Sequence, residues 1–176
     1  MTSVPGRLER VNNSSGIHIF IDHAHKPAAL KAVLQALQDV RENGNISVVF
    51  GCGGDRDKLK RPLMGNIACN LAEKVWVTSD NPRTEDPIAI IEEIKNGLTK
   101  SNGVKIIVDR REAIRQAVED AKTGDILIIA GRGDETHQIV ADPESPKKTK
   151  LVPLDDREVV STYFAEREKT QLTSEK

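Results

Sequence analysis

The stretch SVVFGCGGDRD (residues 47–57) decides the fold, because a short apolar run leads directly into a glycine-rich turn that carries charged side chains. A run of this length bounded by glycine predicts a buried strand. Further short apolar runs, rich in β-branched residues, occur on both sides of it. They span residues 17–21, 75–78, 106–108 and 126–130.

Helical patterns separate these predicted strands. Apolar residues recur every three or four positions in several segments, which predicts helices with one buried face. Pro62 and Pro87 stand where a first helical turn begins, Asp109 with Glu112 resembles a capping box, and Gly124 is placed as a helix stop. The clearest helical segments are 30–40, 91–98 and 113–121.

Strands and helices therefore alternate, which is typical of the α/β class. We predict a single Rossmann-like domain with a mainly parallel sheet of about five or six strands and helices on both faces. Residues 1–168 are assigned to this domain and residues 169–176 to a flexible tail. The polar, Pro- and Lys-rich segment 141–150 is predicted to form a surface loop or hairpin.

The composition excludes several classes of protein. Lys and Arg number 26 against 27 Asp and Glu, so the net charge favours neither nucleic acid nor an acidic membrane as a partner. No apolar run approaches the roughly 18 residues of a membrane helix, and the N-terminus lacks the apolar region of a signal peptide. With two separated cysteines, Cys52 and Cys69, a cytoplasmic location is expected.

Unusual polar segments follow four of the predicted strands. In a parallel sheet ligands bind beyond the carboxyl ends of the strands, so we expect these segments to share one rim. They are DHAH (22–25), GCGGDRD (51–57), DNPR (80–83) and GRGDE (131–135).

The glycine-rich segment 51–57 has two possible interpretations. Its glycines can turn tightly and present amide groups beside Asp55, Arg56 and Asp57, which suits a zwitterionic or anionic ligand. It can equally be an ordinary turn with solvated charges. Neither GxxxxGK[ST] nor a complete GxGxxG is present, so the segment is not a nucleotide-phosphate site by itself.

Arg83 and Glu135 are the charged residues that fit an amino acid. A guanidinium next to the Pro82 turn can hold a carboxylate with two hydrogen bonds, and Glu135 can accept hydrogen bonds from an ammonium. The alternatives are an Asn-Pro turn with a surface arginine and a solvated glutamate.

The remaining polar residues carry weaker signals. His23 and His25 alternate along a segment taken as extended, so we expect them to face opposite ways and to hold no metal together. Asp22 can accept from a ribose hydroxyl or cap the following helix. Cys52 has no evident base partner and is expected to be inert.

Taken together, these segments resemble the C-terminal domain of the Mur ligases over nearly the whole chain. The resemblance rests on an ordered set of motifs. GRLER (6–10) is similar to the family's GRxE, DHAHKP (22–27) to DYAHxP, residues 51–62 to GCGGDRDxxKRP, and residues 80–83 to DNPR.

This resemblance implies part of an ATP-dependent ligase in which a carboxylate becomes an acyl phosphate and an amine attacks it, with Mg²⁺ holding the phosphates. In the family the phosphate loop and a modified metal-binding lysine lie in a central domain, and the UDP site lies in an N-terminal domain. The chain then supplies no catalytic residue and no metal site. We expect it to be inactive alone and to meet ATP and UDP-MurNAc-L-Ala-D-Glu through the other domains.

The resemblance also implies a set of binding residues. Arg7, Asp22 and His25 are expected to face the nucleotide. Arg83 is expected to hold the second carboxylate that distinguishes meso-diaminopimelate from lysine. The expected meso-diaminopimelate contacts are Arg56, Asp80, Asn81, Pro82, Arg83, Gly131 and Glu135.

Several departures from the family pattern leave rival interpretations open. Asp134 replaces the histidine of a GKGHE motif, and His23 and Lys26 replace a tyrosine and a small polar residue. A lysine-adding or folate-type relative is one rival. A stand-alone module that binds an amino acid or a nucleotide is the other.

Overall fold

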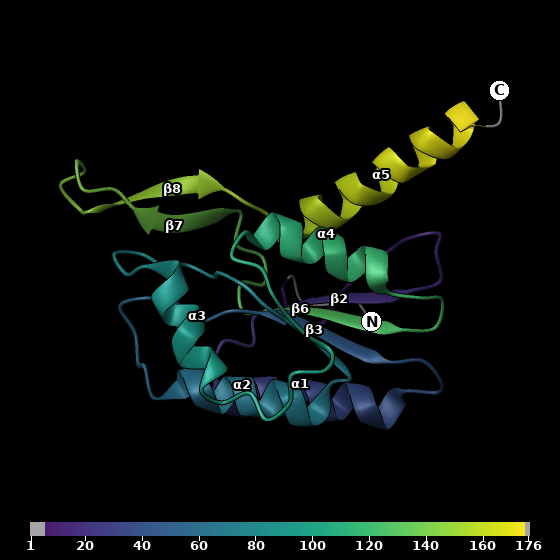
Figure 1. The fold of residues 1–176 in the computed structure, drawn as a ribbon. Coiled ribbons are helices and arrows are strands. Elements are labelled where there is room, and N and C mark those ends of the chain that lie inside the picture. Colours follow the sequence, from purple (N-terminus) through teal and green to yellow (C-terminus); the bar gives the residue numbers. More distant parts are fainter. Residues whose placement is uncertain (1–5, 175–176) are drawn as a thin grey trace.

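The computed structural model describes residues 6–174, which form a central sheet with helices on both faces and a separate hairpin (Figure 1). The strands are β1 (Glu9–Val11), β2 (His18–Asp22), β3 (Ile46–Phe50), β4 (Lys74–Val77), β5 (Val104–Ile106), β6 (Ile126–Ala130), β7 (His137–Ala141) and β8 (Thr149–Pro153). The helices are α1 (Pro27–Val40), α2 (Lys60–Leu71), α3 (Pro87–Lys95), α4 (Arg110–Asp120) and α5 (Asp156–Ser174).

The main sheet has the strand order β1-β2-β6-β3-β4-β5. Only the edge strand β1 runs antiparallel to its neighbour, so the predicted parallel α/β fold is confirmed. Every residue of β3 and β6 is buried, because helices cover both faces of the sheet at these central strands. All strands from β2 to β6 therefore end at one edge, and the site lies there.

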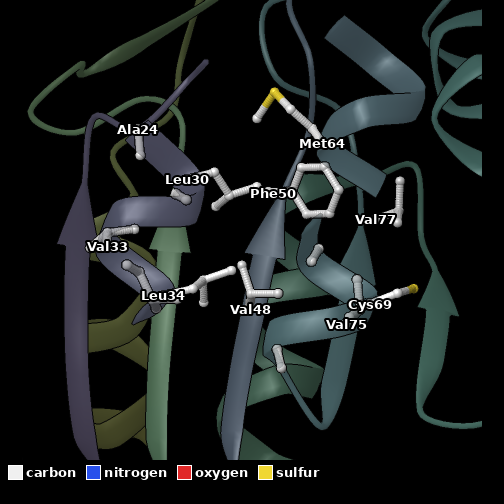
Figure 2. Packing of buried hydrophobic residues seen from close by; sticks show 14 of the residues in the cluster. Ala24, Leu30, Val33, Leu34, Val48, Phe50, Met64, Cys69, Val75 and Val77 are labelled. Carbon is white, nitrogen blue, oxygen red and sulfur yellow. The ribbon is translucent and has the colours of Figure 1, made fainter. Parts of the chain in front are cut away.

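The helices form two layers, with α1, α2 and α3 on one face and α4 and α5 on the other (Figure 1). On the first face, Leu30 and Leu34 of α1 lie beside Phe50 and Val48 of β3 (Figure 2). On the second face, Trp76 of β4 joins the buried residues of α4. The apolar periodicity had predicted these buried faces.

Local signals fixed most element boundaries. Pro87 lies in the first turn of α3 and Pro62 in the first turn of α2. The Asp109 side chain accepts a hydrogen bond from the amide of Glu112 over 3.1 Å, as the capping pattern predicted. Helix α4 ends at Asp120, before Gly124, which instead takes a positive φ of 88° in the following turn.

Two features differ from the sequence-based expectations. Strand β5 begins at Val104, earlier than predicted, because Gly103 turns the chain and Val104 pairs with Val75. Strand β1 was not predicted. Segment 141–150 does form a hairpin, as predicted: it is the turn region of β7–β8, whose strands extend beyond it.

Helix α5 was not predicted either, because only its first turns are buried. Val159 and Val160 are buried in the core on the α4 side of the sheet, and most residues from Ser161 to Thr170 are polar or charged and exposed. The helix continues to Ser174, into the segment expected to be a tail; the flexibility of residues 169–176 stays a prediction. No helix among residues 6–174 is long and apolar enough to cross a membrane.

Candidate functional site

A cleft of about 470 Å³ opens at the carboxyl edge of the sheet. All four polar segments that follow the strands contribute to it, so their predicted co-location is confirmed. Its lining residues are His23, His25, Lys26, Pro27, Gly53, Arg56, Asp57, Lys60, Asp80, Asn81, Arg83, Gly131 and Glu135.

The turn after β4 brings Asn81 and Arg83 to the cleft. Arg83 has a positive φ of 54°, a conformation that costs a non-glycine residue free energy, and its amide donates to the Ile139 carbonyl of the hairpin. Its Nη1 donates to the Gly54 carbonyl over 2.8 Å. The hairpin and the glycine-rich loop therefore hold this turn from two sides and aim the guanidinium along the cleft wall.

The glycine-rich loop is close to the same turn for a reason the sequence analysis missed. Gly51, Gly53 and Gly54 do not have positive φ, so they are not required for a tight turn. A Cβ at Gly54 would instead overlap the Pro82 carbonyl oxygen, and one at Gly51 the Thr78 carbonyl oxygen. These glycines allow two backbones to touch, which places Pro82 as a support of the cleft and not among its lining residues.

Arg61 and Glu85 fix the outer end of this loop. The fully buried Arg61 forms a 2.9 Å ion pair with Glu85, which also accepts from the amide of Asp55 over 2.6 Å. The hydrogen bond from Arg61 lowers the pKa of Glu85 to about 2. Arg56, next to Asp55, has only a weak 3.3 Å bond to the Asp55 carbonyl, so its guanidinium is available to an anion.

Glu135 lines the same cleft from the loop after β6. One of its oxygens, Oε2, accepts from Nδ2 of Asn81 over 2.7 Å. Beside it, Gly131 has a φ of 116°, and a Cβ there would lie 2.6 Å from Oδ2 of Asp80. That Asp80 oxygen is buried and has no hydrogen-bond partner among the described residues. The cleft thus combines free guanidinium donors with carboxylate acceptors.

Three charged residues behind the cleft were missed by the sequence analysis. Arg110, Arg132 and Asp156 are each at most 2% exposed and form one buried network. Nothing in the local pattern distinguishes them from surface charges, because Arg110 begins a helix, Asp156 begins another and Arg132 lies in a polar loop. Only their packing reveals them.

The three residues expected to face a nucleotide are placed differently. His25 lines the cleft, whereas Arg7 and Asp22 do not. The Asp22 carboxylate accepts from the amides of Leu8 and Ala24, each over 2.8 Å. In this state it binds the N-terminal segment and does not cap α1, whose N-cap residue is Lys26.

The expectation that His23 and His25 face opposite ways is wrong. Residues two apart in an extended segment point to the same side, so alternation places these two side chains together, and the two imidazole centroids lie 4.8 Å apart. Each Nδ1 lies near a backbone carbonyl, of Arg132 and of His23 respectively. Within residues 6–174 no group of three His, Cys, Asp or Glu side chains could hold a metal ion.

Cys52 lies beneath the cleft and is nearly fully buried. Its sulfur is 3.6 Å from that of Met64. Burial raises the pKa of the Cys52 thiol to about 12, so the nucleophilic thiolate is disfavoured at neutral pH.

Comparison with known proteins identifies the class to which this fold and cleft belong. The family described as Mur ligase, glutamate ligase domain, matches residues 6–133. The chain belongs to this family.

Within the family, the similar relatives carry one name. A UDP-N-acetylmuramoyl-L-alanyl-D-glutamate--2,6-diaminopimelate ligase from Caldanaerobacter subterraneus subsp. tengcongensis is 45% identical over 95% of this chain and 33% of its own length. The ligase of that name from Rickettsia bellii is 46% identical over 92% of this chain and 32% of its own length. The chain thus spans about a third of these relatives.

Solved structures agree on the fold. A UDP-N-acetylmuramoyl-L-alanyl-D-glutamate--2,6-diaminopimelate ligase superposes with a TM-score of 0.82 at 38% identity, covering 96% of this chain and 33% of that one. A bifunctional folylpolyglutamate synthase/dihydrofolate synthase from Yersinia pestis has a TM-score of 0.56 at 24% identity over 73% of this chain and 28% of its own. The second likeness shows the fold alone.

Proposed function

We propose that this chain is the C-terminal domain of an ATP-dependent ligase and binds meso-diaminopimelate for addition to UDP-MurNAc-L-Ala-D-Glu. The observation that carries the proposal is the cleft, which is lined by the guanidinium groups of Arg56 and Arg83 together with the carboxylate of Glu135. Diaminopimelate has two carboxylates and two ammonium groups. The names of the similar ligases support the same substrate.

Each charged group has a task in this proposal. Arg83 binds the side-chain carboxylate and Arg56 the other one, since a guanidinium suits the planar carboxylate. Glu135, with Asp80 beside it, accepts from an ammonium. Asn81 and Gly131 complete the wall against which the ligand lies. The domain thus holds the amino acid in one orientation while its other amine meets the activated carboxylate, which is catalysis by positioning.

The proposal assigns no nucleotide or metal chemistry to residues 6–174. No phosphate loop occurs in the sequence, and the described residues hold no cluster of three metal-ligand side chains. The family resemblance implies that ATP and Mg²⁺ bind mainly to the other two thirds of such a ligase. Residues Arg7, Asp22 and His25 approach the nucleotide only after the domains close. An enzyme that uses ATP in this way acts in the cytoplasm.

The amino-acid preference of the parent ligase tests the proposal. The assay contains ATP, Mg²⁺, UDP-MurNAc-L-Ala-D-Glu and either meso-diaminopimelate or L-lysine, with product formation measured directly. We expect kcat/KM for diaminopimelate to exceed that for lysine at least about 100-fold, because lysine leaves an arginine unpaired in the cleft. Equal use of both amino acids, or a preference for lysine, would contradict the assignment.

A further inference from the structure

Arg132 lies directly behind the cleft and is fully buried. Its Nη1 donates to Oδ1 of Asn81 over 3.0 Å, and its Nη2 donates to the Leu154 carbonyl over 2.7 Å. A buried guanidinium is unfavourable unless its charge and donors are matched. Burying the Arg132 guanidinium therefore costs free energy, and the groups that it contacts indicate its role.

Its carboxylate partner is mostly occupied by another arginine. Arg110 donates to both oxygens of Asp156, over 2.9 and 2.7 Å, whereas Nε of Arg132 lies 3.8 Å from the nearer oxygen. That Nε has no hydrogen-bond partner among the described residues. Two buried guanidinium groups thus share one carboxylate. The shortest hydrogen bonds of Arg132 go to Leu154, which anchors it, and to Asn81. Its contacts with Glu135 are longer: Nη2 donates to the Glu135 carbonyl over 3.5 Å, and Nη1 lies 3.8 Å from Oε2.

These contacts determine how the Asn81 amide is turned. Its Oδ1 accepts from Arg132 and also from the amide of Ile139 over 2.8 Å. With two donors on the oxygen, the NH₂ group must face the other way. It donates to Oε2 of Glu135 over 2.7 Å. No hydrogen bond within residues 6–174 involves the second oxygen of Glu135, whose side chain is 37% exposed at the cleft.

We propose that Arg132 is a positioning residue of the amino-acid site. Its guanidinium fixes the orientation of the Asn81 amide, the amide NH₂ holds one oxygen of Glu135, and the other oxygen is left to accept from the ligand ammonium. Leu154, two residues before α5, accepts a hydrogen bond from the guanidinium, and Asp156, the first residue of α5, lies 3.8 Å from its Nε. The start of α5, outside the matched residues 6–133, thereby becomes part of the specificity apparatus. This inference rests on the proposed function of the cleft.

A double-mutant cycle in the parent ligase tests the inference. Arg132→Met, Asn81→Ala and the double variant are compared by their KM for meso-diaminopimelate, their KM for ATP and their kcat. Arg132→Met should raise the diaminopimelate KM about 10- to 100-fold, because it removes a charged hydrogen bond from the oriented amide. The KM for ATP should stay within about threefold. In the Asn81→Ala background, Arg132→Met should raise the diaminopimelate KM by less than about a further threefold.

Arg61→Met is the matched control, because Arg61 is equally buried and paired but contacts neither Asn81 nor Glu135. We expect it to lower the melting temperature and to change the diaminopimelate KM by the same factor with or without Asn81. An Arg132→Met effect that is likewise independent of Asn81, or a parallel rise in the ATP KM, would overturn the inference.

Arg132→Lys provides a second test if Arg132→Met does not fold. An ammonium keeps the charge but cannot reach both Asn81 and Leu154 with the arginine's fork, so recovery should be partial and the NMR signals of the Asn81 side-chain NH₂ should shift. Unshifted signals with a normal KM would refute the positioning role. Failure of the wild-type ligase to use diaminopimelate is a different result, because it would refute the proposed function itself.

Discussion

Arg83 illustrates how a single residue can combine an unfavourable backbone with a binding role. Its φ of 54° lies in the left-handed region that favours glycine, yet the residue at this position is an arginine. The Ile139 carbonyl and the Gly54 carbonyl hold its backbone amide and its Nη1 in place. Strain at a residue that lines a cleft is common where the geometry serves a ligand.

Replacement of Arg83 tests its role as the selector of diaminopimelate. In the parent ligase, Arg83→Ala should lower kcat/KM for diaminopimelate by about 30- to 4000-fold, or about 2 to 5 kcal/mol, because a buried ligand carboxylate loses its partner. Use of lysine should change little, and Arg83→Lys should recover only part of the loss.

Arg83→Gly is the matched variant, because it removes the guanidinium together with the backbone strain. Arg83→Gly should lose as much activity as Arg83→Ala. It should unfold at a higher denaturant concentration than Arg83→Ala, because glycine adopts the positive φ without strain. Equal losses for diaminopimelate and lysine would show that Arg83 is not the selector.

At the scale of elements, the cleft exists because loops after different strands touch one another. The glycine-rich loop contacts the turn after β4 through backbone atoms, and Glu85 joins both to Arg61 of α2. Contacts of this kind leave no room for side chains and make the loops one rigid wall.

The glycine contact predicts a specific loss of stability. Gly54→Ala should lower the free energy of unfolding by about 1 to 3 kcal/mol, because the new methyl group would overlap the Pro82 carbonyl. Gly124→Ala is the control: it has a φ of 88° but nothing within 4 Å of its Cβ position. Its loss should be about 1 kcal/mol, from backbone strain alone. Urea unfolding measures both, and only Gly54→Ala should also weaken amino-acid binding.

The Arg61–Glu85 pair predicts how stability depends on pH. The pKa of Glu85 is lowered from 4.5 to about 2 in the folded state, so its contribution is present above about pH 4.5 and is lost as the pH falls toward 2. Glu85 is 19% exposed, so we expect about 1 to 2 kcal/mol. In urea unfolding, the free energy of unfolding should fall less between pH 7 and pH 3 for Glu85→Gln than for the wild type. Parallel curves would contradict this.

At the scale of the whole molecule, the chain provides a cleft lined by charged side chains on an α/β domain and spans about a third of the length of its relatives. Most of its apolar residues with strand or helix periodicity pack into two cores, one on each face of the sheet. The cleft opens at the sheet edge, where closure against further domains would bring the ligand to an activated carboxylate.

The isolated 176-residue chain should neither hydrolyse ATP nor form a peptide bond, because it has no phosphate loop. The measurement is ADP release from ATP by the purified chain with UDP-MurNAc-L-Ala-D-Glu, meso-diaminopimelate and Mg²⁺, with the full ligase as the positive control. Release above the buffer background would refute the prediction. ATP-independent binding of an amino acid by a protein without further ligase domains would instead favour the stand-alone module.

The sequence by itself determined the alternation of the strands β2 to β6 with the helices α1, α3 and α4, the parallel sheet, and the rim that holds Arg56, Arg83 and Glu135. Periodicity and helix caps are local signals, and strand ends in such a sheet share one edge. Tertiary structure alone decided two further features: the Gly54 contact with Pro82 and the burial of Arg132. Each depends on which distant segments meet, here the loops after β3, β4 and β6 and the segment that leads into α5, and no local pattern records that meeting.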